Sequence, residues 1–274
     1  MLKRLSFKAV SVHLVLLLSC AIVAAPVMYA VLGSTLSRSE SFVYPPKLTP
    51  GDSLVENFQQ AWGLGLGHMM FNSAVISVVV TVGKTILALM AALALVYFDF
   101  PWKNGIFVFI FITLMMPVPM RVVPLYNLAA YFKLGDTYTA LILPFLASAT
   151  GTFLFRQHFM SMPKSLVDAA RIDGSGPIRF LVKILVPMSL NTVGALAVIE
   201  FVYMWNQYLW PLLIIHDPAK QVIQIGLKLT SSPGDVTNWG LVMAASVMAA
   251  LPPLVVFLLL QEQFMRGFAL AEEK

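Results

Sequence analysis

The sequence has few charged residues and a single cysteine. Charged side chains make up 11% of its 274 residues, whereas hydrophobic side chains make up 59%. Soluble domains carry about 25% charged and about 45–50% apolar residues, so a soluble enzyme and a disordered chain are both excluded. Cys20 has no second cysteine to pair with, which excludes an intrachain disulfide and a cysteine-based metal site. These absences predict a membrane protein.

Catalytic motifs are missing as well. The sequence has neither the Gly-x-Ser-x-Gly of serine hydrolases nor the His-Glu-x-x-His of zinc proteases. Gly83-Lys84-Thr85 has the form of the end of a phosphate-binding loop, but Val78 stands where that loop requires glycine. We therefore expect no enzymatic activity, no metal and no cofactor in this chain.

Long apolar runs are what the sequence does contain. A helix needs about 20 apolar residues to cross the hydrocarbon core of a bilayer. Six stretches meet this requirement: Val10–Gly33, Met69–Tyr97, Gly105–Leu125, Thr137–His158, Met188–His216 and Gly240–Glu262. None alternates as membrane barrel strands do. We predict an all-α integral membrane protein with six transmembrane helices in a single domain over residues 1–274.

The first apolar run also has features of a cleaved signal peptide. Basic residues precede it, and Leu17-Leu18-Ser19-Cys20 has the form of a lipoprotein cleavage box. The run continues from Ala21 to Leu32, however, where a processed protein would turn polar. We therefore expect a retained transmembrane helix.

The basic residues predict the orientation. With the N-terminus inside, ten of the 18 lysines and arginines fall in the inner segments and five in the longer outer segments. Because cytoplasmic loops are enriched in Lys and Arg, both termini are expected in the cytoplasm. The excess of basic residues in the inner segments accounts for the net charge of +5. A nucleic-acid partner is not needed to explain this charge, and none is expected.

Residues 159–187, which we name the inner loop, have the composition of a folded element. Two short amphipathic helices are expected, separated by a sharp turn at Asp173-Gly174, because glycine adopts a positive φ freely. Ala169 and Ala170 form a thin surface that would let another protein's backbone come close, and Pro187 is expected to end the second helix. We interpret the inner loop as a docking element for a cytoplasmic partner.

The inner loop resembles the EAA signature of ABC importer permeases. The likeness rests on Asp168-Ala169-Ala170-x-x-Asp173-Gly174, then nine intervening residues, then Ile184-x-Val186-Pro187. In that family the loop forms a coupling helix that contacts the ATPase. The resemblance therefore implies ATPase coupling for Asp168, Ala169, Ala170, Asp173, Gly174 and Pro187. Asp168 stands where the pattern usually has Glu, which shortens the side chain that carries the carboxylate, and Ser175 stands where the pattern often has Ala.

Further segments resemble the carbohydrate-uptake branch of these permeases, and within it those of sn-glycerol-3-phosphate importers. These segments are residues 112–121, 147–157 and 205–213, with Arg266-Gly267. The resemblance implies the type I permease fold, a bacterial inner membrane and alternating access. The implied partners are a second homologous permease, two ATPase subunits that hold ATP and Mg, and an extracytoplasmic substrate-binding protein. The implied cargo is sn-glycerol-3-phosphate or a related glycerophosphodiester; the alternative is a neutral sugar.

Polar groups within the spans are candidates for the substrate pathway, because ionisable side chains are costly in a bilayer. Arg121 could pair with a phosphate or extend to the outer headgroups. Glu200 could line the pathway, but we favour its pairing, either with a basic group such as Lys84 or with the partner permease. Four neighbouring residues offer hydrogen bonds and aromatic faces to a polar solute, or anchor the membrane interface: Trp205, Asn206, Gln207 and Tyr208.

A self-sufficient secondary transporter is the main competing class. It would couple transport to an ion through intramembrane acids and broken helices. Glu200 is the only acid deep within a predicted span, and such a transporter leaves the inner loop without a role. We therefore favour the importer permease.

Overall fold

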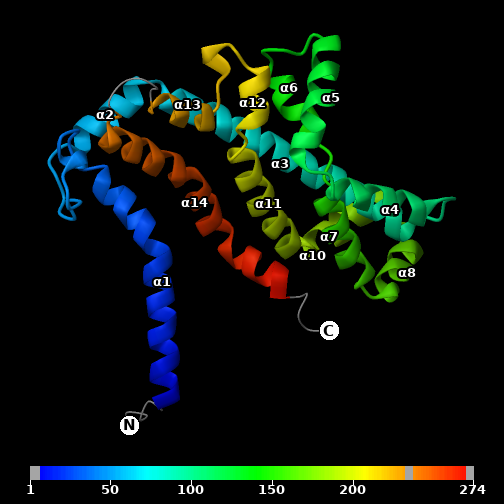
Figure 1. Cartoon of the computed structure of the whole chain (residues 1–274). Helices are drawn as coiled ribbons and strands as arrows, with labels where there is room; N and C mark the ends of the chain where they lie inside the picture. Colours follow the sequence, from blue (N-terminus) through cyan, green and yellow to red (C-terminus); the bar gives the residue numbers. More distant parts are fainter. Residues whose placement is uncertain (1–6, 232–236, 270–274) are drawn as a thin grey trace. The chain divides into compact units, whose positions relative to one another are not determined.

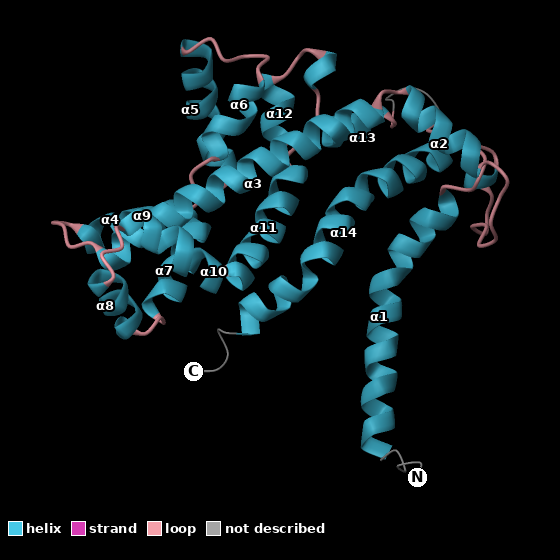
Figure 2. Cartoon of the chain, turned by 180° about the vertical axis from the view of Figure 1, so that it is seen from behind, coloured by secondary structure: helices cyan, strands magenta, loops and turns pink. Residues whose placement is uncertain are grey.

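The computed structural model describes residues 7–231 and 237–269, and the chain forms two compact units. Unit 1 contains Met1–Gly67 and Gly226–Leu251, and unit 2 contains His68–Ile225 and Pro252–Lys274. All regular structure within the described residues is helical (Figures 1 and 2), as the sequence predicted. The single domain over residues 1–274 stays a prediction.

Unit 1 consists of α1, a short outer segment and the start of the last helix. Its elements are α1 (Phe7–Gly33), η1 (Glu40–Phe42), α2 (Leu54–Gly63) and the first part of α14 (Trp239–Ala269). Asn57 fastens α2 to the end of α1, because its Nδ2 donates to the carbonyls of Ser34 and Leu36 at 2.9 Å each. Nearby, a hydrogen bond from Lys47 is the main cause that lowers the pKa of Glu40 to about 2.

Unit 2 begins with α3 (Leu66–Tyr97), a helix of 32 residues. The chain continues through α4 (Lys103–Leu114), α5 (Val118–Tyr131), α6 (Tyr138–Ile142), η2 (Leu143–Phe145), α7 (Ala149–Met160), α8 (Lys164–Ile172), α9 (Pro177–Phe180), η3 (Leu181–Leu185), α10 (Val186–Met188), α11 (Leu190–Trp205), α12 (Leu209–Ile214), η4 (Pro218–Lys220) and α13 (Ile223–Leu229).

Three of the six predicted spans form single regular helices. α1, α3 and α14 cover the first, second and sixth predicted spans and extend beyond their bounds. Within the described residues, four helical stretches are long and apolar enough to cross a membrane, and two bent helix pairs bring the total to six.

The third predicted span, Gly105–Leu125, is wrong as a single helix. α4 ends at Leu114, α5 begins at Val118, and the two helices meet at an angle of 103°. Pro117 caps α5 in an extended conformation with ψ of 141°, and it has no N–H to continue α4. Pro119 follows in the first turn of α5, where a missing N–H costs nothing.

The fourth and fifth predicted spans are also interrupted. In Thr137–His158 the helix stops after η2 and restarts at Ala149, where the Ser148 hydroxyl accepts the N–H of Gly151 at 3.0 Å. In Met188–His216, α11 ends at Trp205, and Pro211 lies in the first turn of the separate helix α12. The length of the apolar runs predicted continuous helices here, because a count of apolar residues does not take account of prolines and capping side chains that end a helix.

The inner loop folds into two helical pieces, as predicted. Gly174 has φ of +66° between α8 and the start of α9 at Pro177. Pro187 does not end the second piece as expected; the chain passes through the π-helical turn η3 and α10, and it bends by 81° at Ser189. A π turn widens the helix just before Pro187, which eases the clash of a proline ring with the carbonyl four residues earlier.

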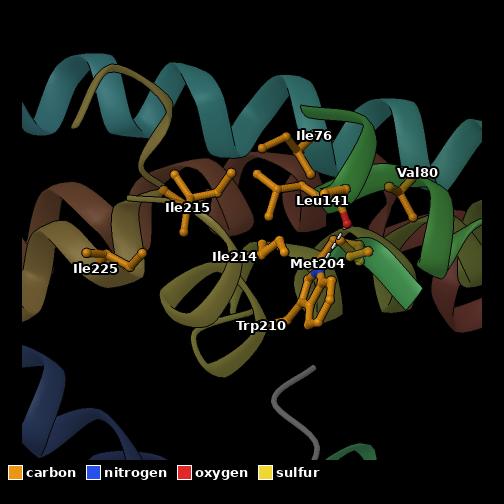
Figure 3. Packing of buried hydrophobic residues seen from close by; sticks show 11 residues of the cluster. Ile76, Val80, Leu141, Met204, Trp210, Ile214, Ile215 and Ile225 are labelled. Carbon is orange, nitrogen blue, oxygen red and sulfur yellow. Dashed lines mark hydrogen bonds between the residues drawn. The ribbon is translucent and has the colours of Figure 1, made fainter. Parts of the chain in front are cut away.

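Trp210 belongs to the first hydrophobic cluster of unit 2. It is 1% exposed, and its indole Nε1 donates to the carbonyl of Ala140 at 2.9 Å. The cluster also contains side chains from α3, α6 and α11, among them Ile76, Leu141 and Met204 (Figure 3). This cluster fixes α12 against α6 on the outer side of the predicted topology.

An acidic side chain fastens the turns beside this cluster. The Asp136 Oδ1 accepts the backbone N–H groups of Asp217 at 2.8 Å and of His216 at 2.5 Å. These two hydrogen bonds stabilise the carboxylate and hold the pKa of Asp136 below its ordinary value.

The second hydrophobic cluster joins the inner loop to α3 and α7. Tyr97 packs edge-on against Phe180, with ring centroids 5.3 Å apart, and its hydroxyl donates to the carbonyl of Phe159 at 3.2 Å. Ala170 is 5% exposed and belongs to this cluster, so it does not offer a surface to another protein as predicted. Because neighbouring helical residues point about 100° apart, Ala169 is exposed while Ala170 is buried.

Gly151 lies where α7 packs against α3 and α11, and it yields a test of the packing. A Cβ at this position would lie 2.9 Å from the Ala88 Cβ and 3.0 Å from the Leu196 Cδ2. We predict that Gly151→Ala destabilises the protein by about 1–3 kcal/mol. The matched control is Gly105→Ala in α4, where the nearest atom is 3.8 Å away; helix propensity there predicts a gain of roughly 0.5–1 kcal/mol. Melting temperatures in detergent measure both, and equal melting temperatures would contradict the prediction.

Candidate functional site

A cavity of about 790 Å³ lies in unit 2. Its wall is formed by α3, α4, the start of α5, the segment before α7, α7 itself and α11. The charged side chains in the wall are Lys84, Arg121 and Glu200, and hydroxyl groups come from Thr113, Ser148, Thr150, Thr152 and Tyr203. A largely apolar cavity of this size with a few convergent polar groups suits a small polar solute.

Two of the interrupted helices meet at this cavity. Met116 and Pro117, between α4 and α5, line it, and so do Ala147 and Ser148, just before α7. Non-helical backbone at membrane depth is tolerated where it is buried in protein or lines a cavity. Discontinuous helices also mark substrate sites in membrane transporters. The breaks that the apolar pattern did not predict therefore help to locate the site.

Lys84 and Glu200 form a buried ion pair in the cavity wall. The Lys84 Nζ lies 2.5 Å from the Glu200 Oε2, and the two side chains are 7% and 6% exposed. The same Nζ lies 4.8 Å from the centre of the Tyr203 ring. The other carboxylate oxygen, Oε1, accepts the Ser148 hydroxyl at 2.7 Å. Of the two pairings that the sequence left open for Glu200, the structure shows the one with Lys84.

Arg121 supplies the net charge of the cavity. It lies in the first turn of α5 and is exposed. Lys84 and Glu200 neutralise each other, so the guanidinium of Arg121 leaves the lining positive. Within the described residues, this guanidinium has no hydrogen bond or ion pair. A planar guanidinium with its donors available can hold a phosphate or carboxylate bidentately.

The other predicted pathway residues lie outside this cavity. Trp205 is 1% exposed and stacks on Phe201, with ring centroids 5.8 Å apart. The Asn206 amide donates to the Val202 carbonyl at 3.0 Å, and Gln207 lines a separate small pocket beside Trp210. Tyr208 packs against the first hydrophobic cluster. These four residues lie at the junction where α11 ends and α12 begins. That they contact a solute stays a prediction.

The inner loop presents a mixed surface around its turn. Asp168, Ala169, Asp173 and Gly174 are exposed, as is Pro187, whereas Ala170 is buried. Beside the turn, Ile172 is 87% exposed and Ile178 is 59% exposed. Sequence reasoning did not single out Ile172. Its position directly before Asp173-Gly174 is a signal that could have identified it, because residues beside an exposed turn are themselves exposed.

Ser148 and Tyr203 are further site residues that sequence reasoning did not single out. A serine two residues before the Thr150-Gly151 pair has the signal of a helix cap, which could have located the start of α7. Tyr203 has no such signal, because its role depends on the approach of Lys84 from another helix. Among residues 7–231 and 237–269, no three His, Cys, Asp or Glu side chains are grouped as metal ligands.

Comparison with known families gives a match over most of the chain. Residues 84–269 match the family described as the binding-protein-dependent transport system inner membrane component. The matched region includes the ion pair, the cavity and the inner loop.

Curated relatives match almost the whole chain. The chain is 42% identical over 270 residues to the sn-glycerol-3-phosphate transport system permease protein UgpE of Agrobacterium fabrum, covering 95% of this chain and 96% of the relative. The proteins of the same description from Brucella melitensis and Escherichia coli UTI89 are also 42% identical, with the same coverage.

Solved structures show the same fold. One is the crystal structure of a bacterial ABC transporter involved in the import of the acidic polysaccharide alginate; it aligns with a TM-score of 0.82 and 21% identity, covering 96% of this chain and 98% of that chain. A second, of the alginate transporter in complex with an alginate pentasaccharide-bound periplasmic protein, has a TM-score of 0.61 and 15% identity, covering 94% and 96%. At these identities the likeness concerns the fold alone.

The buried ion pair can be tested by removing one partner and then both. We predict that Lys84→Met destabilises the protein by about 3–5 kcal/mol, because it leaves the Glu200 carboxylate buried without a counter-charge. The double variant Lys84→Met/Glu200→Leu should recover most of this loss, because no buried charge remains. Melting temperatures in detergent measure both variants. A double variant less stable than Lys84→Met alone would show that the pair does not behave as a mutually neutralised unit.

Proposed function

We propose a cargo and a set of partners for this chain, which belongs to the family of binding-protein-dependent transport system inner membrane components. It is a multi-pass inner-membrane permease subunit of an ABC importer and has the type I permease fold. The cargo we propose is sn-glycerol-3-phosphate or a related glycerophosphodiester, which crosses the membrane by alternating access.

Arg121 is the observation that carries the cargo proposal. A permanently charged guanidinium without a counter-ion in the described residues lines a cavity whose other charges cancel. Such a cavity favours a small solute with one anionic group, and the nearby hydroxyls of Thr113 and Thr150 suit its polyol part. The curated relatives, described as sn-glycerol-3-phosphate permeases, support the same cargo.

The partners we propose follow from the family and from the exposed inner loop. A binding-protein-dependent system requires a substrate-binding protein, which would deliver cargo on the outer side. The exposed Asp168, Ala169 and Asp173, with the turn at Gly174, would dock an ATPase subunit. A second homologous permease would complete the pathway, and two ATPase subunits would hydrolyse ATP with Mg. Both termini would lie in the cytoplasm.

Replacement of Arg121 tests the cargo. We predict that Arg121→Ala raises the KM for sn-glycerol-3-phosphate uptake roughly 10- to 100-fold, because a hydrogen bond to a charged group contributes about 1.5–3 kcal/mol. Uptake is measured in proteoliposomes that contain the whole importer and its binding protein. Arg266→Ala serves as the control, since this arginine forms an exposed ion pair with Glu262. An unchanged KM would show that Arg121 does not bind the cargo and would favour its contact with the outer lipid headgroups. If only neutral sugars stimulate the ATPase of the wild-type complex, the proposed cargo is wrong.

Replacement of Gly174 tests the docking role of the inner loop. We predict that Gly174→Pro reduces cargo-stimulated ATPase activity at least tenfold while the chain still inserts, because proline cannot adopt a φ of +66°. Gly176→Pro is the matched control, since Gly176 has φ of −67°, within the range of proline. Co-purification of the ATPase with each variant is measured in parallel. Full ATPase stimulation and co-purification in Gly174→Pro would contradict the docking role.

A further inference from the structure

Glu200 lies where three helices of unit 2 meet. Its Oε2 pairs with Lys84 of α3, and its Oε1 accepts the hydroxyl of Ser148, the residue that caps α7. The same hydroxyl oxygen accepts the N–H of Gly151 at 3.0 Å. A continuous chain of hydrogen bonds therefore runs from Lys84 through the carboxylate of Glu200 to the first turn of α7.

The packing around this chain leaves α7 little freedom at its first turn. A Cβ on Gly151 would come within 3.0 Å of atoms of both α3 and α11. A Cβ on Gly83, beside Lys84, would lie 2.6 Å from the Leu146 Cδ2 in the segment before α7. Close-packed interiors transmit displacements, so the start of α7 follows any shift of α3 or α11.

The other end of α7 packs against the inner loop. Phe155 and Phe159 of α7 share a buried cluster with Ala170 of α8 and Phe180 of α9. α7 has 12 residues, so it is about 18 Å long at 1.5 Å per residue. In Figures 1 and 2, α8 follows directly on the far end of α7. One short helix thus connects the cavity wall with the loop that we propose docks the ATPase.

We propose that Glu200 is a positioning residue for transport, which acts through Ser148 to hold the start of α7 in the cavity wall. Both carboxylate oxygens are engaged and the charge is matched by Lys84, so Glu200 is not itself a contact of the cargo. Thr150 lies in the first turn of α7 and lines the cavity. A solute that contacts Thr150 therefore contacts the helix whose start Glu200 holds in place. α7 then carries the presence of cargo to the inner loop. This inference rests on the proposed function.

Ser148→Ala is the decisive variant, because it removes the link to α7 and leaves the ion pair of Lys84 and Glu200 intact. Cargo stimulation of the ATPase should fall at least fivefold, while the KM for sn-glycerol-3-phosphate changes less than twofold. Ser148→Thr retains the hydroxyl and should restore stimulation. Ser246→Ala is the control, because within the described residues the Ser246 hydroxyl bonds to the Val242 carbonyl of its own helix.

Glu200→Gln provides the second measurement, with Glu262→Gln as the control at an exposed carboxylate. Loss of stimulation with an unchanged KM is again expected. The assay uses the reconstituted importer with its binding protein and sn-glycerol-3-phosphate. If Glu200→Gln does not assemble, Ser148→Ala alone decides the question.

Three outcomes separate this inference from the function on which it rests. A wild-type importer that does not respond to sn-glycerol-3-phosphate rejects the proposed cargo. A normal wild-type response with a raised KM in Glu200→Gln, matching that of Arg121→Ala, would show that Glu200 contacts cargo and overturn the inference. Full stimulation in Ser148→Ala, or equal loss in Ser148→Ala and Ser148→Thr, overturns it as well.

Discussion

The ion pair between Lys84 and Glu200 is the interaction on which the cavity depends. Either charge alone at membrane depth would cost about 2.5–3.5 kcal/mol on insertion scales, so each is retained in the wall because the other neutralises it. The pair links α3 to α11, and Ser148 extends the link to α7. Because these charges cancel, the electrostatics of the cavity are set by Arg121, which lies on a different element.

The bilayer imposes a second constraint, because it offers no water to free backbone groups. A span can be interrupted only where side chains, prolines or a water-filled cavity compensate for lost hydrogen bonds. The interruptions at Pro117 and Ser148 satisfy this condition, since both residues line the cavity. Pro117 removes the donor that would otherwise be unpaired, and Ser148 supplies a side-chain acceptor. The broken backbone and the polar lining are therefore two consequences of one cavity.

Sequence reasoning recovered the features that depend on local composition. The lengths of the apolar runs predicted α1, α3 and α14, and the requirement for a positive φ predicted the turn at Gly174. A pairing of Glu200 was predictable because few charges lie deep in the spans, whereas its partner, Lys84, was one of two candidates. The burial of Ala170 and Trp205 was not, because it depends on which helix face meets α3, α7 or α11. The break before α7 was missed because Ser148 acts as a cap only when its own backbone is extended, which the apolar pattern does not show.

The same contacts constrain how unit 2 can change conformation. α7 is clamped at its start by Ser148 and Gly151 and at its end by Phe155 and Phe159, so it moves as a rigid body with its neighbours. Changes of φ and ψ must then fall in the non-helical segments on either side, residues 146–148 and 161–163. One of these segments lines the cavity and the other leads into α8. α7 is therefore the element through which a displacement at the cavity wall would reach the inner loop.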